Sequence, residues 1–197
     1  MTAGRAIINK SQEWGTPRKY VDLVTRFFGG GISLDPCSNA YSIVEAETEY
    51  SLPFSDGLKE SWDFSTIYVN PPYGIDKRRK TRIADWLKRC LRAYESHGSE
   101  VVALVPVATN TGHWKKYVWG RARSVCFLYD TRLKFLENGE SGGKGAPMSC
   151  CFVYWGDRQS DFFDMFIRHG AVVNLDGLRG EIIAGIRPQR QLDVFQD

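Results

Sequence analysis

Short apolar segments of strand length alternate with amphipathic segments of helix length along this chain of 197 residues. In the first helix-like segment the apolar residues recur at the spacing of one helical face, at Tyr20, Val21, Leu23, Val24, Phe27 and Phe28. Such alternation is typical of an α/β domain in which helices cover a mostly parallel sheet. We therefore expect residues 1–197 to form a single domain with a core at about residues 11–175.

Turn residues and apolar patterns place the expected elements. Thr16 followed by Pro17 predicts the start of the first helix, with the threonine hydroxyl as its N-cap. The clearest helix extends from Arg82 to Tyr94. A last helix is expected at 162–167, and strands are expected at 32–34, 66–69, 101–105, 124–129, 133–136, 150–155 and 171–175. We expect the strands at 133–136 and 150–155 to form an antiparallel hairpin across the glycine-rich stretch 139–145.

Composition excludes several classes of protein. Hydrophobic residues make up 43% of the chain, which is typical of a globular domain, and its apolar runs are too short to span a bilayer. No signal peptide is predicted. The five cysteines have no C-x-x-C spacing, and none of the three histidines lies near one of them. We therefore predict reduced thiols in a cytoplasm and no metal site.

Charge is unevenly distributed along the chain. From Lys77 to Arg92 there are eight basic residues and one acid, whereas from Asp35 to Asp63 there are seven acids and one base. This arrangement suits a protein that holds a polyanion on one side and a cationic small molecule on the other. Two solvated faces of opposite charge would give the same pattern.

Two polar residues directly follow predicted strands. Asp35 follows the strand at 32–34, and Asn70 follows the strand at 66–69. In open α/β sheets, ligands bind beyond the carboxyl ends of the strands. We therefore expect both residues to lie at a binding site.

The segment Asn70-Pro71-Pro72-Tyr73-Gly74 carries the most specific chemistry. Two consecutive prolines fix two φ angles and remove two backbone donors, so the segment presents carbonyl oxygens on a stiff backbone. The side-chain oxygen of Asn70 and the carbonyl of Pro71 together can accept both hydrogens of an amino group. Tyr73 offers a flat face for stacking. A plain turn is the alternative reading, because Asn and Pro favour turns.

The tetrapeptide resembles that of amino-methyltransferases, and other motifs narrow the resemblance. The ordered motifs are Glu13-Trp14-Gly15-Thr16-Pro17, Leu34-Asp35-Pro36-Cys37-Ser38, Asp56-Gly57-Leu58 with Trp62, Asn70 to Gly74, Arg132-Leu133-Lys134-Phe135 and Ala146-Pro147-Met148-Ser149. Their order resembles that of the phage-type (Dam-type) DNA adenine N6-methyltransferases, over roughly residues 11–156. The resemblance implies a Rossmann-like class I methyltransferase fold, with a mostly parallel sheet and an antiparallel C-terminal hairpin.

The same resemblance implies an S-adenosylmethionine-dependent enzyme that flips adenine out of double-stranded DNA for direct attack on the methyl group. The expected catalytic residues are Asn70, Pro71, Pro72 and Tyr73. The expected cofactor-binding residues are Trp14, Thr16, Pro17, Asp35, Pro36, Cys37, Ser38, Asn39, Asp56, Gly57 and Leu58. The expected DNA-binding residues are Lys77, Arg78, Arg79, Lys80, Arg82 and Phe135, with Phe135 as a second wall of the base pocket.

Several alternatives stay open. Most methyltransferases of this fold have a glycine-rich turn after the first strand, but residues 35–56 contain no glycine. The acid that would bind the ribose of the cofactor is also open, because Glu45, Glu47 and Glu49 are equal candidates. Trp14 could either pack in the core or belong to the cofactor site. The segments 77–80 and 139–145 could either contact DNA or be solvated loops. Methylation of a protein glutamine is disfavoured, because neither a glycine-rich turn nor an extra N-terminal helical domain is present.

Two other functions stay open: methylation of adenine in RNA, and nucleic-acid binding by a catalytically silent protein with the methyltransferase fold. Sequence selectivity is expected to be low, because the parts left over from the core, at 73–81 and 137–146, are short. Phage relatives imply a role in protection from restriction. The sequence gives neither the recognition site nor the oligomeric state.

Overall fold

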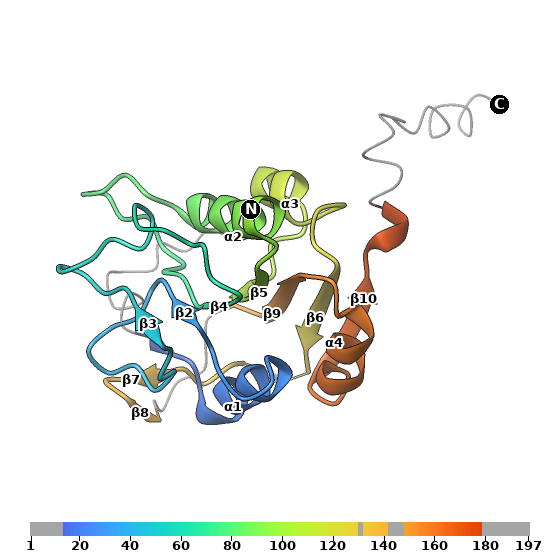
Figure 1. Ribbon diagram of the computed structural model, residues 1–197, viewed down its shortest axis with the longest axis horizontal. Helices are drawn as coiled ribbons and strands as arrows, with labels where there is room; N and C mark the ends of the chain where they lie inside the picture. Colours follow the sequence, from blue (N-terminus) through green and yellow to red (C-terminus); the bar gives the residue numbers. More distant parts are fainter. Residues whose placement is uncertain (1–13, 130–131, 142–147, 179–197) are drawn as a thin grey trace.

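A computed structural model of the chain describes residues 14–129, 132–141 and 148–178. Two sheets and four helices make up this part of the chain (Figure 1). The helices are α1 (Arg18–Phe27), α2 (Ile83–His97), α3 (Gly112–Tyr117) and α4 (Gln159–Phe166). The strands are β1 (Trp14–Gly15), β2 (Leu34–Asp35), β3 (Thr48–Glu49), β4 (Thr66–Val69), β5 (Glu100–Pro106), β6 (Ser124–Leu128), β7 (Leu136–Glu137), β8 (Glu140–Ser141), β9 (Cys150–Trp155) and β10 (Gly170–Asn174).

The main sheet is mixed, with the strand order β10-β6-β9-β5-β4-β2-β3. The pairs β2–β3, β2–β4 and β4–β5 are parallel, and the pairs β5–β9, β9–β6 and β6–β10 are antiparallel. From β2 the chain moves outward to β3 and then returns to β4 on the other side of β2. Strand order therefore reverses between β2 and β4, which is where α/β sheets bind their ligands.

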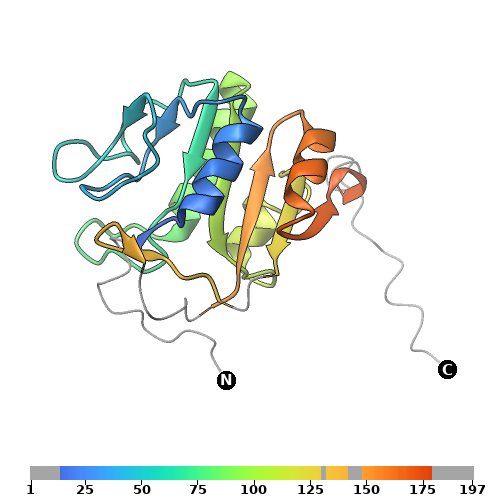
Figure 2. The ribbon, with the colours of Figure 1, turned by 90° about the horizontal axis from the view of Figure 1, so that it is seen from below.

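Helices cover both faces of the main sheet (Figure 2). Alternate residues of β5 face opposite ways: Val101 and Ala103 pack with α2, whereas Val102 and Leu104 pack with α1 and α4. All six residues of β9 are buried. A strand that is apolar on both faces belongs in the interior of a covered sheet, and β9 accordingly lies between β5 and β6.

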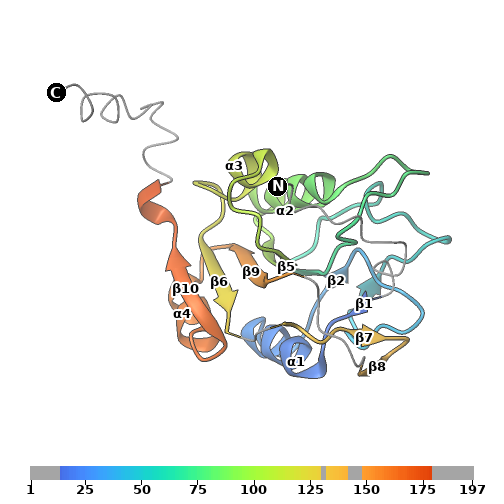
Figure 3. The ribbon, with the colours of Figure 1, turned by 180° about the vertical axis from the view of Figure 1, so that it is seen from behind.

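The expected hairpin between 133–136 and 150–155 is wrong. Leu136 and Glu137 form β7, which pairs with β8 and with the N-terminal strand β1 in a separate three-stranded sheet (Figure 3). The short β7–β8 turn uses Asn138 and Gly139, both at positive φ, as tight hairpins require. Most of the glycine-rich stretch, at 142–147, lies outside the described residues.

The first helix begins one residue later than the expected cap implies. Pro17 is its N-cap residue and no side chain caps the helix. The Thr16 hydroxyl instead bonds to the Tyr68 hydroxyl at 2.6 Å, beneath the helix and within the core. A buried hydroxyl needs a partner, and Tyr68 rather than the helix N-terminus supplies it.

Most of the longer elements agree with the sequence. The long helix, β4, β5, β6, β9 and β10 lie where the patterns predict them, whereas α4 begins three residues before the expected helix at 162–167 and β2 lies at the end of the expected strand at 32–34. The strands β1, β3 and β8 and the helix α3 were not predicted, because two to six residues are too few to show a period. None of the described helices is both long and apolar enough to traverse a bilayer.

Candidate active site

Asp35 and Asn70 lie together at the carboxyl ends of β2 and β4, as the sequence predicts. These strands are paired through Leu34 and Ile67. Asp35 is buried, and its Oδ1 accepts a hydrogen bond from the Cys37 N–H at 3.0 Å. Burial raises the pKa of the Asp35 carboxyl to about 7. Within the described residues no lysine or arginine pairs with this carboxylate.

A cavity of about 260 Å³, here called the strand-end cavity, opens beside Asp35. It is lined by Pro36, Cys37, Ser38, Asn39, Ala40, Tyr41, Tyr50, Leu52, Ser55, Gly57, Pro72, Arg79 and Trp86. Five of the residues expected to bind a cofactor are in this lining, and Asp35 lies directly before them. Its volume is close to the lower end of ligand pockets, which is about 300 Å³.

The other residues expected at a cofactor lie around this cavity or apart from it. Asp56 lies just before Gly57 and bonds through Oδ1 to the Leu58 N–H at 3.2 Å. Leu58 packs against the core. Thr16 is buried against Tyr68, and Pro17 starts α1. Neither Thr16 nor Pro17 lines the strand-end cavity.

A close backbone approach shapes the floor of the cavity. A Cβ added to Gly57 would lie 1.7 Å from the Pro36 carbonyl oxygen, so this position admits only glycine without backbone movement. The Trp62 indole donates to the Gly57 carbonyl at 2.7 Å and fixes the approach. Gly57 therefore gives the site a close contact that a glycine-rich turn after β2 would otherwise supply.

A second cavity, here called the tetrapeptide cavity, surrounds Asn70 to Tyr73 and measures only about 10 Å³, which is room for about one water molecule. It is lined by Trp14, Cys37, Asn39, Asn70, Pro71, Pro72, Tyr73 and Phe135. The Asn70 side-chain Nδ2 donates to the Trp14 carbonyl at 2.9 Å. Because an amide carries its donor and its acceptor on opposite sides, this bond leaves the Asn70 oxygen available as an acceptor.

Aromatic rings form the walls of the tetrapeptide cavity. Trp14 and Phe135 stack with their centroids 5.2 Å apart, and Tyr73 meets Phe135 edge-on at 5.7 Å. The Tyr73 hydroxyl donates to the Leu104 carbonyl at 3.3 Å, and burial raises the pKa of this phenol well above its usual value. Tyr73 is therefore neutral and held in place. Trp14 lies in this cavity rather than in the strand-end cavity.

The two cavities adjoin, because Cys37, Asn39 and Pro72 line both of them. Burial raises the pKa of the Cys37 thiol well above its usual value, so the thiol stays protonated and is a poor nucleophile. Cys37 also packs against the core.

Among the three acidic candidates beside β2, Glu49 stands closest to the strand-end cavity. It is paired with Asp35 in the β2–β3 register, and its carboxylate accepts from the Ser38 hydroxyl at 2.7 Å. Ser38 itself lines the cavity. The sequence does not distinguish Glu49 from Glu45 and Glu47, because the two-residue strand β3 leaves no pattern.

The basic segment after the tetrapeptide forms a closed loop. Asp76 and Thr81 exchange two backbone hydrogen bonds, and the Asp76 carboxylate accepts from the N–H groups of Arg78 and Arg79. Lys77, Arg78, Lys80 and Arg82 are exposed. The sequence predicts this loop as a contact for phosphates, and four of its five cations face solvent.

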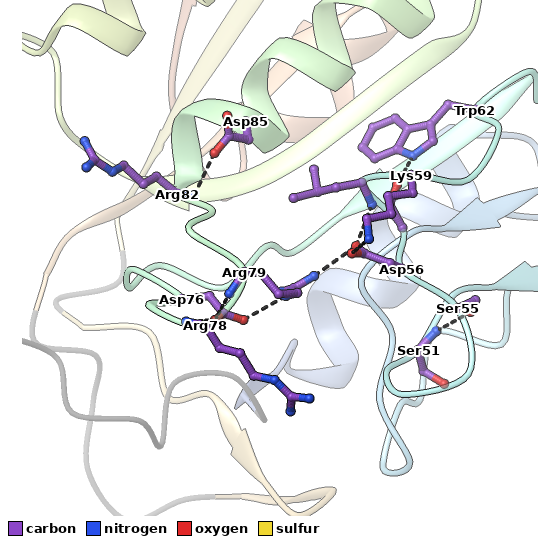
Figure 4. A network of polar contacts seen from close by, with 12 residues as sticks. Ser51, Ser55, Asp56, Lys59, Trp62, Asp76, Arg78, Arg79, Arg82 and Asp85 are labelled. Carbon is purple, nitrogen blue, oxygen red and sulfur yellow. Dashed lines mark hydrogen bonds and ion pairs between the residues drawn. The ribbon is translucent and has the colours of Figure 1, made fainter.

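Arg79 differs from its neighbours. Its guanidinium lies between two carboxylates, with Nη1 2.9 Å from Asp56 and Nε 2.7 Å from Asp76 (Figure 4). Only 19% of its side chain is exposed, and it lines the strand-end cavity. Arg79 therefore ties the basic loop to the wall of that cavity. The sequence alone does not show that Arg79 is held by ion pairs while the neighbouring basic residues are exposed.

A family model described as DNA N-6-adenine-methyltransferase (Dam) matches residues 6–174 of the 197. The match takes in both cavities, the basic loop and the whole main sheet. The comparison with curated proteins found no match.

The buried carboxyl of Asp35 predicts a pH-dependent stability difference. Its pKa of about 7 in the folded state lies above the ordinary value of 3.8 for an aspartate, so the folded state holds this proton more tightly than the unfolded chain. Its contribution to stability is complete at low pH and is lost as the pH rises to 7. Asp35→Asn should therefore gain stability relative to wild type by roughly 2 kcal/mol between pH 5 and pH 8.

Denaturant unfolding of both proteins at each pH measures this difference. Asp22→Asn, on the exposed side of α1, controls for the loss of a carboxylate. A stability difference between Asp35→Asn and wild type that does not change with pH would contradict the assignment.

The ion pairs of Arg79 predict that this residue holds the basic loop closed. Arg79→Ala leaves two carboxylates facing each other and should speed amide hydrogen exchange at Asp76 and Thr81. The free energy of unfolding should fall by about 1 kcal/mol, because both pairs are partly exposed. Arg78→Ala removes an exposed cation from the same loop and should change neither quantity. Equal exchange in the two variants would show that the loop closes without Arg79.

Proposed function

The chain belongs to the DNA N-6-adenine-methyltransferase (Dam) family, and from this premise we propose that it transfers a methyl group from S-adenosylmethionine to the N6 amino group of adenine in DNA. One observation carries the proposal. The amide of Asn70 is oriented by the Trp14 carbonyl, next to Pro71 and inside a cavity walled by Tyr73 and Phe135. Two fixed acceptors between aromatic rings suit a planar base that carries an amino group.

The residues of the tetrapeptide cavity hold and activate the amino group. The Asn70 Oδ1 and the Pro71 carbonyl accept its two hydrogens, which returns lone-pair density from the ring to the nitrogen. Tyr73 and Phe135 flank the base, and because their rings meet edge-on at 5.7 Å in the free protein, they move apart to admit it. Rotation of the base out of the duplex costs a few kcal/mol of unstacking. Because the acceptors are fixed before the reaction, they need no reorganisation as positive charge develops on the nitrogen.

The residues of the strand-end cavity fit the cofactor. When bound, S-adenosylmethionine supplies a sulfonium methyl group with a neutral thioether as leaving group. Asp35 is a buried carboxylate with no cation beside it among the described residues, which suits a ligand that carries an ammonium group. Pro36 to Asn39 would hold this methionine end, Glu49 the ribose hydroxyls, and Asp56, Gly57 and Leu58 the adenine end.

The contacts of the basic loop suggest different roles for its cations. Lys77, Arg78, Lys80 and Arg82 are exposed and serve as phosphate contacts on double-stranded DNA. Arg79 instead positions the loop through Asp56 and Asp76. Trp14 acts at the base pocket, where it orients Asn70. Thr16 and Pro17 connect Trp14 to the start of α1, and Thr16 is anchored in the core by Tyr68.

The fold and setting complete the proposal. Parallel strands β3, β2, β4 and β5 with helices on both faces support a Rossmann-like class I methyltransferase fold. Five free cysteines, four of them buried, support a reducing cytoplasm, that of a bacterial host. Protection of DNA from restriction is the role that suits a phage-type enzyme.

Replacement of Asn70 tests the proposed chemistry. Asn70→Ala removes one preorganised acceptor and should lower turnover roughly 10²–10³-fold with little change in cofactor affinity. Turnover is measured as transfer of labelled methyl from S-adenosylmethionine to duplex DNA, single-stranded DNA and RNA, followed by nucleoside analysis. Asn110→Ala, at an exposed site on another loop, is the control. Turnover of Asn70→Ala within twofold of wild type would remove Asn70 from the mechanism.

Low sequence selectivity is the second expected outcome. Reading a multi-base site in the major groove needs an element that reaches base edges. Here the exposed loop after the tetrapeptide is dominated by lysine and arginine, which suit phosphates. We expect adenine to be methylated in a context of very few bases. Sequencing of methylated adenines after expression in a methylation-free host measures this, and a fixed motif of four or more base pairs would contradict it.

A further inference from the structure

A third cavity begins where the tetrapeptide cavity ends. It measures about 440 Å³ and lies between the segment that follows the tetrapeptide and the short helix α3. It is lined by Tyr73, Gly74, Ile75, Arg82, Ile83, Ala84, Gly112, His113, Lys116 and Tyr117. We call it the α3 groove. Tyr73 lines both this groove and the tetrapeptide cavity, so its ring lies between the two.

The lining of the groove is cationic at two points. Arg82 comes from the start of α2 and Lys116 from α3, so the two cations belong to different elements. Asp85 accepts only the backbone N–H of Arg82, at 2.8 Å (Figure 4). Within residues 14–129, 132–141 and 148–178 no carboxylate forms an ion pair with either side chain. Both positive charges are therefore available to an anion.

The rest of the lining is apolar or neutral. Ile75 is 60% exposed, and Tyr73 and Tyr117 add aromatic surface. Burial lowers the pKa of His113, so its ring is uncharged at neutral pH, and its Nε2 lies 3.1 Å from the Thr111 hydroxyl. A cleft with apolar walls and two free cations suits a sugar and its phosphate better than a small inorganic ion.

We infer that the α3 groove binds the sugar–phosphate of the DNA strand next to the target adenine, with Arg82 and Lys116 as its phosphate contacts. This inference rests on the proposed function. A nucleotide whose base occupies the tetrapeptide cavity continues past Tyr73 into this groove, because the opposite side of that cavity, at Cys37, Asn39 and Pro72, opens into the strand-end cavity. Lys116 thereby joins the DNA-binding set, and α3 becomes part of the substrate interface.

Helix α3 offers a matched pair of variants. Lys115 and Lys116 are adjacent and both exposed, but only Lys116 lines the groove. The affinity for a short duplex that contains adenine is measured for Lys116→Ala, Lys115→Ala and Arg82→Ala over a range of salt concentrations. Lys116→Ala and Arg82→Ala should each weaken binding several-fold and reduce the slope of log affinity against log salt by about one unit. Lys115→Ala should leave the slope unchanged, and cofactor affinity should be the same in all variants.

The outcomes separate this inference from the proposed function. If wild type methylates adenine while Lys116→Ala and Lys115→Ala bind DNA with the same slope, the groove assignment is overturned and the enzyme remains. If wild type binds DNA with the predicted difference between the two lysines but transfers no methyl group, the groove stands and the proposed reaction fails. A wild-type protein that does not bind DNA at all would overturn both.

Discussion

The hydrogen bond from the Asn70 amide to the Trp14 carbonyl joins two parts of the chain that are far apart in sequence, and Trp14 contacts a third. Trp14 belongs to β1, which pairs with β7, and this pairing brings Phe135 against the Trp14 ring. The bond also sets which end of the Asn70 amide faces the cavity. The N-terminal strand thus determines both the shape and the polarity of the tetrapeptide cavity, although the tetrapeptide itself follows a strand of the main sheet.

The strand-end cavity depends on a different constraint, the burial of one carboxylate beside a close backbone contact. Asp35 is held at the end of β2, where burial raises its pKa to about 7. The chain has no glycine-rich turn at this point, and Gly57 provides the close approach to Pro36 from the next loop. Asp56, the residue before Gly57, binds Arg79 of the basic loop. Asp56 and Gly57 therefore link the basic loop to the strand-end cavity, because Asp56 binds Arg79 and Gly57 lies against Pro36.

Sequence reasoning locates the strand ends well, because Asp35 and Asn70 each follow an apolar strand and two prolines leave little freedom at residues 71 and 72. It fails where the elements are very short. The two-residue strands β1 and β7 have no period, so their pairing, the Asn70–Trp14 bond and the place of Phe135 come only from the three-dimensional structure. The sequence also gives no means of distinguishing neighbouring residues of the same charge. Arg79 and Arg78 are neighbours of the same type, and only their contacts show that one is fastened between two carboxylates. Helix α3, with Lys116, was missed for the same reason as β7.

The central claim is that adenine is held by Asn70 and Pro71 in the tetrapeptide cavity while the cofactor occupies the strand-end cavity. A crystal structure of the protein with duplex DNA and a non-reactive analogue of S-adenosylmethionine tests it most directly. We expect an extrahelical adenine whose N6 lies within about 3 Å of the Asn70 Oδ1 and the Pro71 carbonyl oxygen, with the Tyr73 and Phe135 rings moved apart to flank it. An adenine that stays stacked in the duplex, or an analogue bound away from Asp35, would contradict it.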